Sequence, residues 1–342
     1  MTESKQPYLG PSPDTLVEVR DLKKYFPITK GFLRRVVGQV KAVDGVSFDI
    51  KAGEALGLVG ESGCGKSVTA LSIMRLLPQP AGRIEAGRIL LQDTDIVRLP
   101  AAALPGLRGR RIAMIFQEPM TALNPVHRIG NQVAEAFHLH RPELDHRAVA
   151  REVVAMLEKV RIPEPAARVK AYPHQISGGM RQRVMIAMAL AARPDILIAD
   201  EPTTALDVTI QAQILSLMRD LQADTGTAIL FITHDLGVIA ELCHRVVVMY
   251  AGRIVESATV AALFRNPRHP YTQGLMAAIP RLDRAPKAPL ATIEGTVPAL
   301  GAMPPGCRFA NRCPQVMDRC RLTPPPLVEV GEEHLVACYL YS

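Results

Sequence analysis

The chain has 342 residues and a net charge of +7, with 48% hydrophobic and 21% charged residues. This length fits one large domain with an appendage or two medium domains, and the composition is typical of a folded, well-cored protein. No run of 18 uncharged apolar residues occurs and the N-terminus does not resemble a secretory signal, so we expect a cytoplasmic location without membrane spans. Aromatic residues make up only 4% and basic residues form no dense run, so we expect no nucleic acid as a partner.

The N-terminal part is predicted to form strands. Apolar alternation marks Leu16–Val19, Val40–Val43 and Val46–Ile50 as strands. The segment Ile28–Gln39 is polar and basic with glycines, and this composition favours a loop. A short apolar run, Ala55–Val59, reads as a buried strand.

A phosphate-binding loop follows that strand, because residues 60–67 match G-x-x-x-x-G-K-[ST]. The glycines let several N–H groups point inward, and the helix predicted over Lys66–Leu77 aims its positive end at the same spot. Lys66 would reach the β- and γ-phosphates, and the Ser67 hydroxyl would hold Mg²⁺. The residues predicted to bind the nucleotide here are Gly60, Glu61, Ser62, Gly63, Cys64, Gly65, Lys66, Ser67 and Val68.

Strands and helices alternate through the middle of the chain. Further strands are predicted at Gly87–Leu91, Ile112–Phe116, Ile196–Ala199, Ala228–Thr233 and Val246–Met249. Helix-period segments at Ile129–His140 and Asp145–Val160, separated by prolines, predict a helical insertion over about residues 118–192. The pattern indicates an α/β domain with a mainly parallel sheet. Prolines and four of the six cysteines gather after residue 265, so residues 266–342 form a predicted C-terminal extension.

Two further motifs carry chemistry. Asp200 and Glu201 end the strand Ile196–Ala199, where a carboxylate can order Mg²⁺ and the next one can act as general base on a water. Ser177 and two glycines begin a helix predicted to run to about Ala192, and such a helix start is an anion site. One chain would then have two phosphate-binding ends but one nucleotide, unless the second end serves another subunit's nucleotide.

These motifs, in this order over residues 16–265, resemble the ATP-binding cassette (ABC) family. The resemblance implies a P-loop NTPase fold for residues 1–265, with a RecA-like core, an antiparallel β subdomain and a helical subdomain. It makes Ser177, Gly178, Gly179 and Met180 the signature that contacts the partner's ATP. Lys66, Glu201 and His234 become the catalytic groups, of which His234 holds the γ-phosphate.

Three further roles come with the resemblance. Gln117 falls where the family binds Mg²⁺ and senses the transmembrane partner, so that Ser67, Gln117 and Asp200 form the magnesium set. Asp207 lies in the loop Thr204-Ala205-Leu206-Asp207, which in the family touches the opposing subunit. Phe26 is the candidate for stacking on adenine, with Tyr25 as the alternative.

Finer features resemble the ATPase subunits of oligopeptide and dipeptide importers. They are the segment Tyr172–Gln175, Met180 in place of the signature glutamine, and His269-Pro270-Tyr271-Thr272. Val68 replaces a frequent threonine. The resemblance implies a second, non-identical ATPase subunit, two permease subunits and an extracytoplasmic peptide-binding protein, with this chain peripheral on the cytoplasmic face of the inner membrane. A nickel or glutathione cargo and, as a different class, a soluble ABC ATPase acting on nucleic acid or ribosomes remain alternatives.

The cysteines of the extension have the spacing C-x5-C-x6-C-x17-C, formed by Cys307, Cys313, Cys320 and Cys338. A reducing cytoplasm disfavours disulfides, and structural zinc usually needs a closer pair. Looser spacing and the Cys313-Pro314 pair suit an iron–sulfur cluster, and the importer family is known to carry [4Fe–4S] here. Zinc and four unliganded cysteines stay open, as does a redox or iron sensor that gates transport.

Overall fold

The structure, a computed structural model, describes residues 13–31, 35–78, 82–117, 122–204, 206–279, 292–298, 301 and 303–342. It divides into two compact units. Unit 1 comprises Met1–Lys51, Ala55–Arg98 and Ile232–Ser342, and unit 2 comprises Ala52–Glu54 and Leu99–Phe231. Among the described residues, no helix combines the length and apolar character needed to cross a membrane.

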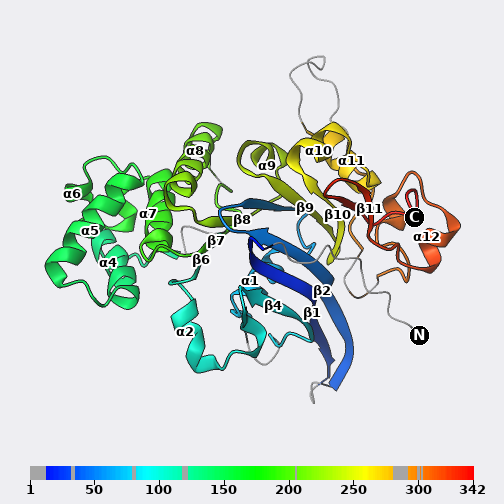
Figure 1. The fold of residues 1–342 in the computed structure, drawn as a ribbon, viewed down its shortest axis with the longest axis horizontal. Helices are drawn as coiled ribbons and strands as arrows, with labels where there is room; N and C mark the ends of the chain where they lie inside the picture. The colour runs from blue at the N-terminus through cyan, green and yellow to red at the C-terminus, as the bar shows by residue number, and fades with distance from the viewer. Residues whose placement is uncertain are drawn as a thin grey trace. The chain divides into compact units, whose positions relative to one another are not determined.

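Unit 1 contains a four-stranded antiparallel sheet in the order β2-β1-β4-β5 (Figure 1). Its strands are β1 (Thr15–Lys30), β2 (Arg35–Lys51), β4 (Ala86–Leu91) and β5 (Thr94–Asp95). The predicted loop was wrong at residues 28–30 and 35–39, because β1 continues to Lys30 and β2 begins at Arg35; residues 32–34 lie outside the described residues. Backbone pairing, such as Phe26 with Val40 and Ile28 with Gly38, overrides the polar composition by giving each strand its ladder hydrogen bonds.

A second set of strands in unit 1 has the order β11-β12-β10-β9-β3. The strands are β3 (Ala55–Val59), β9 (Arg245–Tyr250), β10 (Arg253–Thr259), β11 (Val328–Gly331) and β12 (His334–Val336). The entire β3 strand is buried and pairs in parallel with β9, as a core strand does. The extension contributes β11 and β12, which continue this sheet by antiparallel pairing of β12 with β10.

The helices of unit 1 are short. They are α1 (Lys66–Ile73), α9 (Leu236–Leu242), α10 (Val260–Arg265), α11 (Pro270–Ala277) and α12 (Asp318–Leu322). The helix after the phosphate loop ends four residues before the predicted Leu77, because Met74 closes it and Arg75 turns to a φ of 50°.

Unit 2 combines core strands with a helical cluster, whose helices α4 to α7 group together in Figure 1. Its strand order is β8-β7-β6, with β6 (Ile112–Ile115) parallel to β7 (Ile196–Asp200), and β8 (Ala228–Thr233) has its first four residues here. The helices are α2 (Leu104–Leu107), α4 (Ile129–His140), α5 (His146–Lys159), α6 (Pro165–Arg168), α7 (Gly178–Leu190) and α8 (Val208–Thr225).

The two helices predicted in the insertion are confirmed as α4 and α5. Asp145 caps α5 by accepting a hydrogen bond from the Ala148 N–H, which places the helix start at the next residue. Apolar side chains buried on each helix, such as Phe137 and Val153, form the packed face. The first residues of the predicted helical subdomain, 118–121, lie outside the described residues.

Candidate nucleotide-binding site

The phosphate loop joins β3 to α1 in a backbone path that only glycine fits. A Cβ atom on Gly60 would lie 2.2 Å from the Met249 carbonyl oxygen. Gly65 has a φ of +101°, and a Cβ there would lie 2.4 Å from the Ala42 carbonyl oxygen. Both positions therefore exclude every side chain, by contact and, at Gly65, also by backbone conformation.

Lys66 is held by the loop that precedes it. Its side chain is buried, and Nζ donates to the carbonyl oxygens of Gly60, at 2.7 Å, and Glu61, at 3.1 Å. Cys64, within the loop, is also buried, and burial raises the pKa of its thiol, so the thiol stays protonated. Ser62 and Gly63 are exposed at the loop surface. Ser67 and Val68, in the first turn of α1, are half-buried.

The ends of β6 and β7 bring two predicted site residues together in unit 2. The two strands are parallel neighbours, so their carboxyl ends meet at one edge. Gln117 Nε2 donates to Glu201 Oε2 at 3.1 Å, and the Thr204 hydroxyl donates to the same oxygen at 3.0 Å. Because a carboxylate only accepts, the Gln117 amide must present its nitrogen to Glu201 and its oxygen elsewhere.

The acidic pair has contrasting environments. Asp200 is the last residue of β7 and is 4% exposed. Glu201 is half-buried and has a φ of +47°, an uncommon conformation for a residue with a side chain, which concentrates at functional sites. The turn therefore directs two adjacent carboxylates differently, one into the core and one toward Gln117.

The signature lies at the start of α7, also in unit 2. Ser177 caps the helix, and its hydroxyl accepts from the Met180 N–H at 3.3 Å. A Cβ on Gly179 would lie 2.7 Å from Ile210 Cγ2, so packing against α8 demands glycine there. A Cβ on Gly178 would meet nothing within 4 Å, and Gly178 is exposed like Ser177. The need for glycine at this position does not come from the described contacts of the chain itself.

Two more predicted residues, Asp207 and His234, are exposed. Asp207 caps α8 by accepting from the Ile210 N–H at 3.0 Å, and Val208 beside it is 83% exposed. His234 follows the last residue of β8 and is exposed. Ala205, within the predicted subunit-contact loop, lies outside the described residues.

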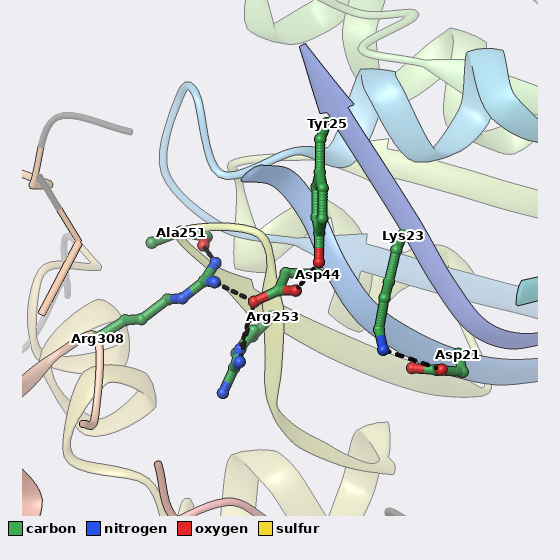
Figure 2. A network of polar contacts seen from close by, with 7 residues as sticks. All are labelled: Asp21, Lys23, Tyr25, Asp44, Ala251, Arg253 and Arg308. Carbon is green, nitrogen blue, oxygen red and sulfur yellow. Dashed lines mark hydrogen bonds and ion pairs between the residues drawn. The ribbon is translucent and has the colours of Figure 1, made fainter. Parts of the chain in front are cut away.

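The two candidate aromatic residues of β1 differ in their surroundings. Tyr25 donates its hydroxyl to Asp44 Oδ1 at 2.5 Å, and burial raises the pKa of Tyr25, so it remains a donor (Figure 2). Successive strand residues point to opposite faces, so Phe26 faces away from this network. Its ring is half-buried, with Lys24 Nζ 4.1 Å from the centroid. Tyr25 is therefore engaged in the protein, and Phe26 remains the stacking candidate.

Two residues of the extension contact the phosphate loop, and the sequence analysis assigned neither of them. The Glu61 N–H donates to the Tyr271 hydroxyl at 2.8 Å, and Arg312 donates to both carboxylate oxygens of Glu61, at 2.6 and 3.0 Å. The only signal for Tyr271 was its place in the His-Pro-Tyr-Thr motif. Arg312 had no signal beyond its neighbour Cys313.

The four cysteines of the extension line one cavity together with His269 and Phe309. All are free thiols. Burial raises the pKa of Cys307 to about 11, and it also raises the pKa of Cys313 and of Cys338. Thiol donors gathered on one cavity suit an iron–sulfur cluster chemically. Among the described residues, however, no three His, Cys, Asp or Glu side chains have the geometry of a formed metal site.

A buried strand, a glycine loop, a helix start and an acidic pair after a parallel strand define a P-loop nucleotide-binding domain. Residues 43–204 match the ABC transporter family, and residues 255–320 match the family "Oligopeptide/dipeptide transporter, C-terminal region". A solved structure titled as the ATP-binding cassette MJ0796 bound to ADP and Pi is 25% identical, with a TM-score of 0.62, covering 71% of this chain and 98% of that one. Another, of cbiO1 from Clostridium perfringens, has 25% identity and a TM-score of 0.61, covering 74% and 92%.

Curated relatives extend over nearly the whole chain. A "Probable peptide ABC transporter ATP-binding protein y4tR" of Sinorhizobium fredii is 51% identical over 96% of this chain and 96% of its own length. The dipeptide transport ATP-binding protein DppD of Bacillus subtilis is 52% identical, over 89% and 90%. AppD of the same organism, an oligopeptide transport ATP-binding protein, is 49% identical over 96% and 97%. The chain belongs to the ABC transporter family, and the predicted family, α/β P-loop fold and transport-coupled ATPase class are confirmed.

Proposed function

We propose that this chain binds and hydrolyses ATP as a subunit of an importer for dipeptides and oligopeptides. The relatives named for peptide, dipeptide and oligopeptide transport, at about half identity over nearly their full lengths, support the cargo class. The observation that carries the hydrolytic role is the Glu201 carboxylate, which Gln117 and Thr204 orient at the end of two parallel strands.

ATP binding uses the phosphate loop and its helix. Backbone N–H groups of residues 60–67 and the start of α1 receive the phosphates, and Lys66 exchanges the loop carbonyls for phosphate oxygens. Phe26 stacks on the adenine. Ser67, Gln117 and Asp200 would hold Mg²⁺, which, when bound, neutralises charge on the β- and γ-phosphates.

Hydrolysis needs a base beside the γ-phosphate. Glu201 takes a proton from the attacking water, and the two donors on its Oε2 hold the carboxylate in place. Lys66 and His234 stabilise the charge on the γ-phosphate as the water attacks. The contribution of the protein is mainly positioning and electrostatics.

The second half of the site comes from a partner ATPase subunit. Gly178 has open space where a side chain would stand, which supports close approach by a nucleotide bound to another subunit. Ser177, Gly179 and Met180 complete that surface, and Asp207 lies at the subunit contact. We infer a non-identical ATPase partner, two permease subunits and an extracytoplasmic peptide-binding protein, with this chain on the cytoplasmic face of the inner membrane.

The test is Glu201→Gln in the assembled transporter. We expect ATP binding within about twofold of wild type and loss of at least 100-fold in turnover, as for removal of a general base. The subunits should stay closed on ATP, which gel filtration of the ATPase pair would detect. Unchanged turnover would refute the general-base role. Peptide uptake compared with nickel and glutathione uptake in proteoliposomes tests the cargo.

We also propose that Cys307, Cys313, Cys320 and Cys338 hold an iron–sulfur cluster, supported by their convergence on one cavity. The four cysteine thiolates would bind the cluster iron atoms and so cross-link the extension. Anaerobically purified protein should contain iron and sulfide in equal amounts, with visible absorbance that Cys313→Ser removes. Zinc in place of iron, or no metal in anaerobic protein, would contradict this assignment.

A further inference from the structure

Two residues of the extension, Tyr271 and Arg312, form hydrogen bonds with Glu61 of the phosphate loop. The Tyr271 hydroxyl accepts from the Glu61 N–H at 2.8 Å. The Arg312 guanidinium clamps the Glu61 carboxylate with both terminal nitrogens, at 2.6 and 3.0 Å. A two-point Arg–carboxylate pair fixes orientation as well as distance. Backbone and side chain of Glu61 are thus both tied to residues more than 200 positions away in the sequence.

Arg312 is a buried residue and not a surface cation. Its side chain is 4% exposed. The guanidinium also donates to the carbonyl oxygens of Glu294, at 3.0 Å, and Ile293, at 3.1 Å, and to the Tyr250 hydroxyl at 3.4 Å. Hydrogen bonds to Glu61 raise the pKa of Arg312. A buried guanidinium with this many fixed partners is a rigid support for the loop.

The tyrosine is equally fixed. Tyr271 is completely buried, and its ring packs against Tyr250 and Phe309, with centroids 4.7 and 5.4 Å apart. It lies in the first turn of α11, whose start is held because Glu256 accepts from the His269 N–H at 2.9 Å. A hydroxyl on such a ring can hold a loop amide in one place.

We propose that Arg312 and Tyr271 are positioning residues for nucleotide binding, which hold the phosphate loop through Glu61 in the conformation that receives ATP. A loop rich in glycine samples many backbone conformations, and the apparent affinity falls with the fraction of molecules in the binding conformation. The extension would therefore set the ATP affinity of the cassette. This inference rests on the phosphate loop being the nucleotide site.

The test uses Arg312→Met, which keeps an apolar stem, and Tyr271→Phe, which removes only a hydroxyl. We expect the Kd for MgATP to rise about tenfold and about threefold, respectively, the sizes expected for a charge-assisted and a neutral hydrogen bond. In the assembled transporter, kcat at saturating ATP should stay within about twofold. Hydrogen exchange at residues 60–67 should accelerate in both variants, and most at Glu61 in Tyr271→Phe.

The matched control is Glu333→Gln. It breaks an ion pair of 3.0 Å between the extension and Lys51, outside the phosphate loop. Its Kd and its loop exchange should equal those of wild type. If Arg312→Met does not fold, Arg312→Lys and Tyr271→Phe carry the test, with the lysine variant giving an intermediate Kd because it keeps the charge but not the two-point geometry.

The outcomes separate this inference from the proposed function. Unchanged Kd and unchanged loop exchange in Arg312→Met and Tyr271→Phe, with Lys66→Ala abolishing binding, would overturn the positioning role alone. An equal loss in Glu333→Gln would also overturn it, by showing a general effect of loosening the extension. Full ATP binding by Lys66→Ala would overturn the nucleotide site itself.

Discussion

Asp44 is the centre of a buried ionic network whose disruption has a calculable cost. Tyr25, Arg253 and Arg308 all point to its carboxylate (Figure 2). Asp44 is 6% exposed, and the side chain of Arg308 is 7% exposed and also donates to the Ala251 carbonyl. Burial lowers the pKa of Arg308 to about 10, so the guanidinium stays charged at neutral pH.

Asp44→Asn removes the charge and leaves Arg308 buried without a counter-charge. Breaking one side of a buried ion pair costs about 3–5 kcal/mol. Arg253 is one-third exposed and can turn to water, so we take the lower end, about 3 kcal/mol. Glu333→Gln is the matched control, because it breaks another pair between β2 and the extension. Its partners are 34% and 44% exposed, and such pairs contribute about 0–1 kcal/mol.

Urea unfolding followed by far-UV circular dichroism measures both variants, since the chain has no tryptophan. The pH dependence adds a second check. Burial alone would raise the pKa of Asp44, but the Tyr25 hydroxyl and the two guanidinium groups outweigh it and lower the pKa. The stabilisation is therefore complete above about pH 4 and is lost as the pH falls through the folded-state pKa. The difference between wild type and Asp44→Asn should be constant from pH 6 to 8 and narrow below about pH 4. Equal losses in Asp44→Asn and Glu333→Gln would refute the reasoning.

Three further substitutions test individual residues. Gly65→Ala forces a Cβ within 2.4 Å of the Ala42 carbonyl at a φ of +101°, so calorimetric titration should show ATP affinity reduced more than tenfold, and retained affinity would contradict the geometry. Gly178→Ala should leave the melting temperature unchanged while weakening ATP-dependent pairing with the partner subunit in gel filtration; a lowered melting temperature would point to an internal packing role instead. Glu256→Gln should lower the free energy of unfolding, measured in urea, by about 2–3 kcal/mol. The reason is that the buried carboxylate accepts from two backbone N–H groups and from His334 Nε2 at 2.7 Å. A loss below about 0.5 kcal/mol would contradict a stabilising role for these hydrogen bonds.

The sequence predicted those elements whose determining residues are close together in the chain. The phosphate loop, its entering strand β3 and the helices α4 and α5 follow from spacing and caps within a few residues of each element. The outer part of the β1–β2 hairpin was not predicted in this way. This part is stabilised by cross-strand pairing, and composition alone made residues 28–39 resemble a loop.

The contacts of the extension could not be predicted in this way. Arg312 and Glu61 are 251 positions apart, and Arg308 and Asp44 are 264 apart. Neither arginine belongs to a recognisable sequence motif. Their acidic partners lie in the predicted phosphate loop (Glu61) and between two predicted strands (Asp44), where nothing in the local sequence indicates an ion pair. Such pairs join segments far apart in the sequence, so they depend on the tertiary fold rather than on local spacing.

The same extension reaches the phosphate loop by a second route, through the turn between β9 and β10. Arg308 donates to the Ala251 carbonyl, and the next residue, Gly252, donates its N–H to the Cys64 carbonyl at 2.8 Å. Gly252 also accepts from the Asp44 N–H at 2.9 Å, so the ionic network and the loop share one turn. Because one route holds Glu61 and the other holds Cys64, the residues on both ends of the exposed segment Ser62–Gly63 are fixed by hydrogen bonds. Residues 308–312 therefore reach the phosphate loop at two positions, directly at Glu61 and through the β9–β10 turn at Cys64, so the loop conformation depends on more than one contact of the extension.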